Sequence, residues 1–134
     1  MSYLLDTSVC VALLRGRVAE APLPPVSECR LSVITAAELE VGVRRSVRPA
    51  AQRQAVTALL GLFEVLPWDL DTVAHYGEIR VDLEKRGVVI GPLDLLIAAH
   101  ARRLGATLIT GNIGEFQRVE GLPCLGWEVR RGPR

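Results

Sequence analysis

Five side chains that offer oxygen atoms stand where an apolar segment of the sequence gives way to a helical one. Asp6 ends the apolar run at the start of the chain, and Glu38 lies near the start of the second predicted helix. Asp94 lies in the first turn of a helix that opens with "GPLD", and Asn112 and Glu115 follow the apolar segment "TLIT". Strand-to-helix junctions of a parallel sheet gather along one edge, so these residues can meet in one crevice.

Most of these side chains are carboxylates, and carboxylates brought together repel one another. Some of them must take up protons unless a cation joins them. A divalent ion such as Mg²⁺ or Mn²⁺ suits such a site because it prefers oxygen ligands and also coordinates substrate phosphate. It can activate water and neutralise charge on a phosphodiester under attack. The pattern therefore points to metal-assisted hydrolysis of a phosphodiester bond.

The elements that must position these residues alternate between strand and helix. Short apolar runs predict strands, and amphipathic runs opened by proline or closed by glycine predict helices. This alternation predicts an α/β fold with a mainly parallel sheet and helices on both faces. We expect a single domain, residues 1–134, with 129–134 as a flexible tail. The predicted strands are 2–5, 30–35, 64–68, 106–110 and 124–129, and the predicted helices are 7–16, 35–45, 49–63, 69–87 and 92–105, with a helical turn in 113–119.

Each acidic residue also has a purely structural interpretation. Asp6, or a hydroxyl beside it, can cap the first helix. The segment "TAAE" fits a capping box, in which the Glu38 side chain returns to the backbone N–H of Thr35. Asp94 can simply favour the positive end of its helix, and Glu115 can be an exposed turn residue. Capping alone would leave these side chains at separate helix ends, whereas a site requires them to converge.

The formal net charge is only +1, so no global field requires nucleic acid or a membrane as partner. Lys85 is the only lysine, and the remaining basic residues are arginines, which bind phosphate through two hydrogen bonds at once. Arginines near the crevice are candidates for RNA contacts, although arginines on helices usually face solvent. These candidates are Arg15, Arg17, Arg44, Arg45, Arg48, Arg102 and Arg103, of which Arg44 and Arg48 are expected to share one helix face.

Other kinds of site are disfavoured. The sequence has no GxGxxG fingerprint and no GxxxxGK[ST] loop, which argues against dinucleotide or NTP binding. His75 and His100 lie within predicted helices, where packing is more common than catalysis. Cys10 has apolar neighbours and is expected in the core, and Trp68 and Trp127 are expected to be packing residues.

The location of the protein is predicted from its cysteines and its apolar segments. The three cysteines form no CxxC pair, and no signal-peptide pattern or membrane-spanning stretch is found. We therefore expect a reducing cytoplasm, with the thiols buried or inert.

Four segments in order, "YLLDTSV", "SVITAAELEVGV", "VVIGPLDLLIAAHARRLGATLIT" and "GNIGEFQRVEGL", resemble the PIN-domain ribonucleases, above all the VapC-type toxins of toxin–antitoxin pairs. The resemblance runs from Tyr3 to Trp127. It implies a three-layer α/β/α sandwich and Mg²⁺- or Mn²⁺-dependent endonucleolytic cleavage of single-stranded or loop RNA, often tRNA or rRNA.

The resemblance also assigns roles to residues. Asp6, Glu38 and Asp94 match the three acidic residues of the family site, with Asp6 and Asp94 as the main metal ligands. Glu38 would help to hold the metal or orient the attacking water. Many members have a further aspartate where Asn112 stands, so either Glu115 fills this fourth role or Asn112 acts as a neutral ligand. Hydroxyl residues that match family positions are Thr7, Ser8 and Thr110.

Several partners follow from the resemblance as expectations. They are RNA, a second copy of the chain in a homodimer, and a VapB-type antitoxin. The antitoxin would bind operator DNA, so that the toxin contacts this DNA only through it. It could dock on the helices at 8–15 and 35–65. No membrane partner is expected. An alternative, permitted by Gly111 and Asn112, is a regulatory PIN-fold protein with weak or no nuclease activity. An aspartyl-phosphate phosphatase is disfavoured because Ser8 stands where that pattern has a second aspartate.

Overall fold

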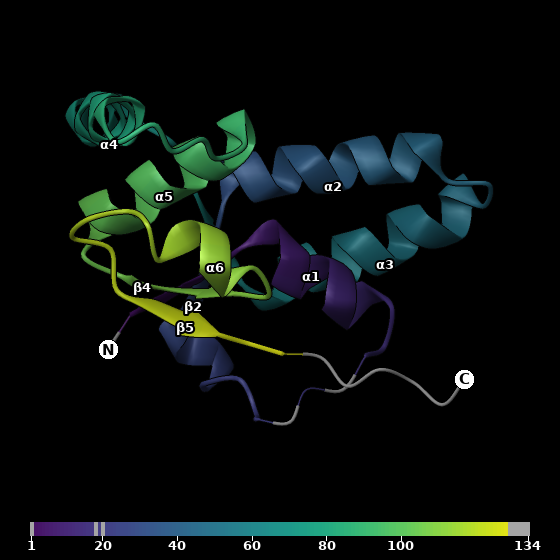
Figure 1. The fold of residues 1–134 in the computed structure, drawn as a ribbon. Coiled ribbons are helices and arrows are strands. Elements are labelled where there is room, and N and C mark those ends of the chain that lie inside the picture. Colours follow the sequence, from purple (N-terminus) through teal and green to yellow (C-terminus); the bar gives the residue numbers. More distant parts are fainter. Residues whose placement is uncertain (1, 18, 20, 129–134) are drawn as a thin grey trace.

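The centre of the protein is a parallel sheet of five strands in the order β3-β2-β1-β4-β5, seen in a computed structural model (Figure 1). The structure describes residues 2–17, 19 and 21–128, so the predicted tail at 129–134 lies outside the described residues. The strands are β1 (Tyr3–Leu5), β2 (Cys29–Ser32), β3 (Glu64–Leu66), β4 (Thr107–Thr110) and β5 (Cys124–Gly126).

Helices cover both faces of this sheet, as the alternating pattern predicted. Figure 1 shows α4 beside α5 and α2 beside α3, in agreement with the contacts between these pairs. None of the helices in the described part of the chain is long and apolar enough to cross a membrane. The α-helices are α1 (Thr7–Leu14), α2 (Val33–Arg45), α3 (Pro49–Leu62), α4 (Val73–Lys85), α5 (Pro92–Leu104) and α6 (Ile113–Phe116), and the 3₁₀ turns are η1 (Val26–Glu28) and η2 (Leu70–Thr72).

Two hydrophobic clusters, one on each face, bury the sheet. Leu4 pairs with Leu108 in the sheet, and both belong to the cluster formed with α4 and α5. Leu5 pairs with Ile109, and both belong to the cluster formed with α1, α2 and α3. Because successive side chains of a strand point to opposite faces, neighbouring apolar residues fill two cores. The predicted three-layer α/β/α sandwich is confirmed.

The start of α2 differs from the prediction. The strand prediction ran to residue 35, but β2 ends at Ser32 and α2 begins at Val33. The Ser32 side chain caps the helix by accepting a hydrogen bond from the Ile34 amide at 3.1 Å. Thr35 therefore lies inside the helix, fully buried, and the predicted capping box at "TAAE" is wrong.

The prediction that Arg44 and Arg48 lie on the same face of one helix is also wrong. Helix α2 ends at Arg45, and Arg48 precedes Pro49, the first residue of α3. A residue before proline is driven out of the helical region, so the chain breaks here and the two arginines belong to different elements.

The strand order reverses beside β1. From β1 the chain moves outward through β2 and β3, and later returns to the other side of β1 with β4 and β5. At such a switch point the loops that leave the two central strands diverge, so a crevice opens at their carboxyl ends. The residues that follow β1 and β4, Asp6 and Gly111, lie at this edge.

Candidate active site

Asp6 occupies the crevice at the end of β1 and is only 2% exposed. It is the N-cap of α1, because its Oδ1 accepts a hydrogen bond from the Val9 amide at 3.1 Å and another from the Ser8 hydroxyl at 2.5 Å. Its Oδ2 accepts a hydrogen bond from the Thr110 hydroxyl. Burial raises the pKa of Asp6, although these hydrogen bonds oppose the shift. Asp6 thus caps a helix and still keeps a lone pair on Oδ2 for a further ligand.

Glu38 reaches the same crevice from α2. The Thr7 hydroxyl donates a hydrogen bond to Glu38 Oε1 at 2.8 Å and lies 3.2 Å from the Thr35 hydroxyl. This bond joins the first turn of α1 to the second turn of α2. The Glu38 side chain is therefore directed by Thr7 and not by the capping box that the sequence suggested.

Asp94 approaches from the first turn of α5 and lies close to Glu115 of α6. The pKa of Asp94 is raised to about 7, chiefly by burial and then by a hydrogen bond with the Glu115 carboxyl and by the negative charges of Glu115, Asp6 and Glu38. Burial and the neighbouring carboxylates thus both disfavour a negative charge on Asp94, and a cation in the crevice would relieve this.

Glu115 is tied down by two further contacts. Its Oε1 accepts a hydrogen bond from the Gly91 amide at 2.8 Å, and its Oε2 accepts one from Asn112 Nδ2 at 2.5 Å. The first contact fixes α6 against the residue that precedes α5, and the second lies within the first turn of α6. Glu115 is not an exposed turn residue, and it stands behind Asp94 rather than on the pocket wall.

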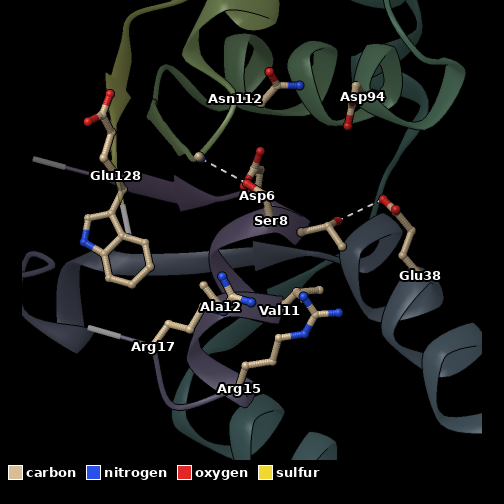
Figure 2. Close-up of a pocket in the computed structure, with 13 residues that line it drawn as sticks. Asp6, Ser8, Val11, Ala12, Arg15, Arg17, Glu38, Asp94, Asn112 and Glu128 are labelled. Atoms are coloured by element: carbon tan, nitrogen blue, oxygen red, sulfur yellow. Dashed lines mark hydrogen bonds between the residues drawn. The ribbon is translucent and has the colours of Figure 1, made fainter. Parts of the chain in front are cut away.

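The crevice is a pocket of about 650 Å³ whose wall includes Asp6, Glu38 and Asp94. Figure 2 shows these carboxylates across the pocket from the side chains of Arg15 and Arg17. The pocket therefore has an acidic side and a basic side. Its other lining residues are Thr7, Ser8, Val11, Ala12, Gly111, Asn112, Trp127 and Glu128.

Among the candidate arginines, Arg15 and Arg17 alone line this pocket. Neither is paired with a carboxylate in the described part of the chain. Three others are engaged in ion pairs: Arg44 with Glu40, Arg102 with Glu78, and Arg103 with Asp71.

Comparison with known proteins places the chain in a family. The PIN-domain sequence profile matches residues 3–122. The chain belongs to the PIN-domain family. It is 34% identical to Ribonuclease VapC2 of Rickettsia felis, over 96% of this chain and 99% of that protein. It is 31% identical to the tRNA(fMet)-specific endonuclease VapC of Salmonella typhimurium, over 95% of this chain and 98% of that protein.

A solved structure supports the same placement of this PIN domain. VapBC2 from Rickettsia felis, bound to a DNA fragment from its promoter, contains a chain that superposes with a TM-score of 0.86. That chain is 32% identical to this one, and the match covers 96% of this chain and 100% of that one. The resemblance to VapC-type PIN domains found in the sequence is confirmed.

The donor set of this PIN domain fits a divalent cation held in an open site. No three His, Cys, Asp or Glu side chains among the described residues form a ready-made cage for an ion. Mg²⁺, however, retains several water ligands and commonly uses only one or two protein carboxylates. Three carboxylates on one wall, one of them with a strongly raised pKa, supply the oxygen donors and the negative charge that such an ion requires.

Two pocket residues were not expected from the sequence. Trp127, predicted to be a packing residue, is buried and donates its indole N–H to the Ala21 carbonyl at 3.0 Å, but it also lines the pocket. Glu128 is the second of these residues. It lies two residues beyond β5, at the same edge of the sheet as Asp6, so its position after a strand was the available signal.

Proposed function

We propose that this PIN domain is the toxin of a VapBC pair, an endoribonuclease that hydrolyses RNA phosphodiester bonds with Mg²⁺ or Mn²⁺. The observation that carries the proposal is the convergence of Asp6, Glu38 and Asp94 on one pocket. Its relatives are named as a ribonuclease and as an endonuclease. These names favour this function over the alternative of a regulatory protein with weak or no nuclease activity.

In this proposal Asp6 and Asp94 would hold the ion, and Glu38 would face the water that attacks phosphorus. The bound ion would lower the pKa of water and offset the negative charge of the phosphate. Glu38, directed by Thr7, accepts the proton of the water as its oxygen bonds to phosphorus and the P–O bond to the leaving oxygen breaks. Asn112 lines the pocket with an uncharged side chain at the position where many family members have an acidic residue.

RNA is the proposed substrate because the basic side of the pocket faces the acidic side. Arg15 and Arg17 can bind phosphates on either side of the one that is cleaved, since their guanidinium groups are exposed and unpaired with carboxylates of the described chain. Phosphate contacts position a strand without reading its bases. One relative is named for tRNA(fMet), so tRNA is the first substrate class to test.

The proposed antitoxin site is a groove of about 350 Å³ between α1, α2 and α3. It shares Val11, Arg15 and Glu38 with the active-site pocket, so a segment docked in it lies next to the carboxylates. Similar chains occur in VapBC complexes, one of them on promoter DNA. We propose that a VapB-type antitoxin fills the groove and provides the operator contact. The homodimer stays a prediction that sedimentation of the isolated chain would test.

A cleavage assay with a matched pair of variants tests the function. Asp6→Asn keeps an oxygen for the helix cap but removes the charge. It should lower Mn²⁺-dependent tRNA cleavage by about 100-fold or more, since metal-centred charge stabilisation is worth several kcal/mol. Asp82→Asn, which alters an ion pair with Arg86 on α4, should cleave like wild type. Equal activity of the two variants would remove the catalytic assignment of Asp6.

Metal binding has a readout that does not depend on cleavage. An ion that binds the native state raises the melting temperature by mass action. Mn²⁺ should therefore raise the melting temperature of wild type and of Asp82→Asn, with a smaller rise in Asp6→Asn. No rise in wild type at saturating Mn²⁺ would count against a metal site in this pocket.

A further inference from the structure

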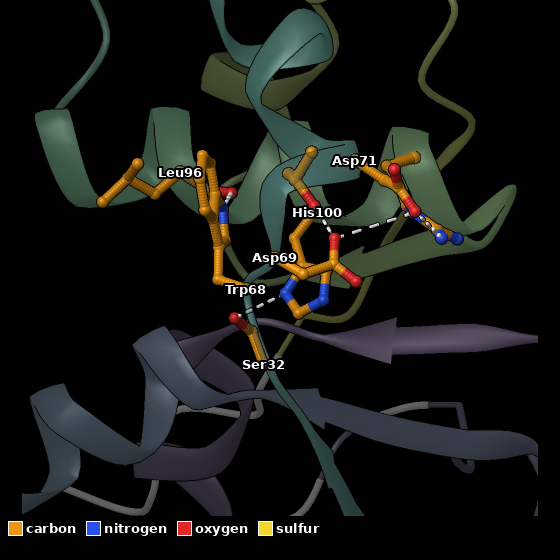
Figure 3. Close-up of polar contacts among 8 residues, drawn as sticks. Ser32, Trp68, Asp69, Asp71, Leu96 and His100 are labelled. Atoms are coloured by element: carbon orange, nitrogen blue, oxygen red, sulfur yellow. Dashed lines mark hydrogen bonds and ion pairs between the residues drawn. The ribbon is translucent and has the colours of Figure 1, made fainter.

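Behind the active site, a buried hydrogen bond joins the two helices that carry Glu38 and Asp94. His100 of α5 is 1% exposed, and its Nδ1 lies 2.8 Å from the hydroxyl of Ser32, the residue that ends β2 and caps α2. Figure 3 shows the imidazole ring facing this serine from below α5. The histidine is buried and does not line the pocket, so the proposed chemistry does not use it directly.

The donors and acceptors of this network fit only one arrangement. The Ser32 oxygen already accepts the Ile34 amide, so its single proton is free to be donated to His100 Nδ1. The ring proton is then on Nε2, and the ring is hydrogen-bonded to the backbone of Pro67. Proline has no N–H, so its carbonyl is the acceptor. Burial lowers the pKa of His100, which favours the neutral ring that this arrangement needs.

The hydrogen bond between Ser32 and His100 lies close to the carboxylates of Glu38 and Asp94 along the helices that carry them. Ser32 lies six residues before Glu38, and His100 lies six residues after Asp94. At 1.5 Å per residue, each end of the bond is about 9 Å along its helix from a carboxylate. A second bond, from the Trp68 indole to the Leu96 carbonyl at 2.9 Å, fixes the segment after β3 to the same helix. The polar ties between α2, α5 and this segment thus converge on His100 and its neighbours.

We propose that His100 is a positioning residue of the active site, which acts through Ser32 to hold Glu38, which faces the attacking water, at the required distance from Asp94, which would hold the ion. The inference rests on the proposed function for its metal-dependent readout. The opposing interpretation is that His100 is a hydrogen-bonded core residue whose loss would only destabilise the fold.

Two variants of similar size separate these interpretations. In His100→Asn, the amide can replace Nδ1 and accept from Ser32, while the bond to Pro67 is lost. In His100→Gln, the longer side chain can replace Nε2 and donate to Pro67, while the bond to Ser32 is lost. Each variant loses the ring and one hydrogen bond, so a purely structural role predicts that both behave alike.

The positioning role predicts that they differ at the active site. His100→Gln and Ser32→Ala should weaken Mn²⁺ binding about tenfold and lower kcat by a similar factor, as the loss of outer contacts does in other metal sites. KM for RNA should stay unchanged because the arginines are untouched. His100→Asn and Ser32→Thr, which keep the bond, should bind Mn²⁺ like wild type. Equal Mn²⁺ affinity in His100→Asn and His100→Gln would overturn the proposal.

A metal-free measurement separates failure of this inference from failure of the proposed function. Hydrogen exchange of the Ile34 amide reports the cap of α2 directly. It should be faster in His100→Gln than in His100→Asn, and equal rates would contradict the role of Ser32. If wild type bound no Mn²⁺ and cleaved no RNA, the proposed function would fall, and the Ile34 exchange would still decide whether His100 holds this cap.

Discussion

The hydroxyl group of Thr110, the last residue of β4, donates a hydrogen bond to Oδ2 of Asp6, the residue that follows β1. The two residues are 104 positions apart, and the bond crosses the place where the strand order reverses. The same hydroxyl accepts a hydrogen bond from the Asn112 amide at 2.8 Å. The central carboxylate of the proposed metal site is therefore held by the last residue of β4 as well as by its own helix.

This bond leads to the first prediction. Thr110→Val keeps the shape of the buried side chain but removes the hydrogen-bond partner of Asp6 Oδ2 and of the backbone N–H of Asn112. It should lower the free energy of unfolding by about 1–3 kcal/mol and weaken Mn²⁺ binding about tenfold. Thr110→Ser retains the hydroxyl and should bind Mn²⁺ like wild type. Urea unfolding and Mn²⁺ titration measure both effects, and similar Mn²⁺ affinity in the two variants would contradict the prediction.

The secondary structure was predictable where the chain carries its own boundary signals. Pro49 and Pro92 begin α3 and α5, and Gly105 ends α5 with a φ of 65°. These residues restrict the backbone locally, so sequence alone is informative. The start of α2 was not predictable in this way, because Ser32 and Thr35 are both good capping residues. The choice of Ser32 goes together with its contact to His100, which is distant in sequence.

The convergence of the acidic residues was predictable from topology, but their contacts were not. A parallel sheet brings the residues after its central strands to one edge, as the positions of Asp6 and Glu38 illustrate. Capping and pocket formation do not exclude each other, because Asp6 does both. The close contact of Asp94 with Glu115 depends on side-chain conformations that no sequence pattern encodes. The catalytic roles of these residues stay predictions.

The raised pKa of Asp94 leads to the second prediction, which concerns stability. In the folded, metal-free protein this pKa is about 7, above the ordinary value of 3.8. Between these values the folded state holds a proton that the unfolded state has lost. The free energy of unfolding should therefore fall as the pH rises through this window, and the stabilisation is lost above about pH 7.

Asp94→Asn removes this titration, so its stability should depend less on pH than that of wild type. In EDTA it should melt at a higher temperature than wild type near about pH 8 and show no such gain near about pH 4. Asp82→Asn, which lies away from the cluster, is the matched control. If the melting temperatures of Asp94→Asn and wild type changed with pH in the same way, the pKa of Asp94 would not be raised in the folded protein.

Glu115 gives the third prediction, which distinguishes a supporting residue from a metal ligand. Its hydrogen bond and its charge are among the causes that raise the pKa of Asp94. Glu115→Gln keeps an oxygen for the Gly91 amide but removes the charge. The pKa of Asp94 should therefore fall, and at limiting Mg²⁺ the rise of kcat/KM with pH should move to lower pH.

Glu115→Ala should act differently, because it also removes the contact to Gly91 that holds α6 against the start of α5 and the contact to Asn112 within α6. It should lower kcat/KM at every pH. If Glu115 were instead a metal ligand, Glu115→Gln would also weaken Mg²⁺-dependent cleavage across the whole pH range. The pH profiles of the two variants decide between these roles.

The basic side of the pocket gives the fourth prediction. Arg17 lines the active-site pocket but not the groove proposed for the antitoxin, whereas Arg45 lines the groove but not the pocket. Arg17→Gln should raise KM for RNA at unchanged kcat, because a phosphate contact helps the strand to bind without entering the chemistry. The slope of log affinity against log salt concentration should fall by about 0.7, the value for one phosphate of a single strand.

Arg45→Gln should show the opposite selectivity, with weaker antitoxin binding and an unchanged KM for RNA. Arg15 borders both spaces, so Arg15→Gln should affect both measurements. Arg44→Gln, whose arginine is paired with Glu40 on the surface, is a control for the loss of one positive charge. If Arg44→Gln lowered the salt dependence of RNA affinity as much as Arg17→Gln does, the effect would come from the net charge of the protein. Arg17 would then make no specific contact with RNA.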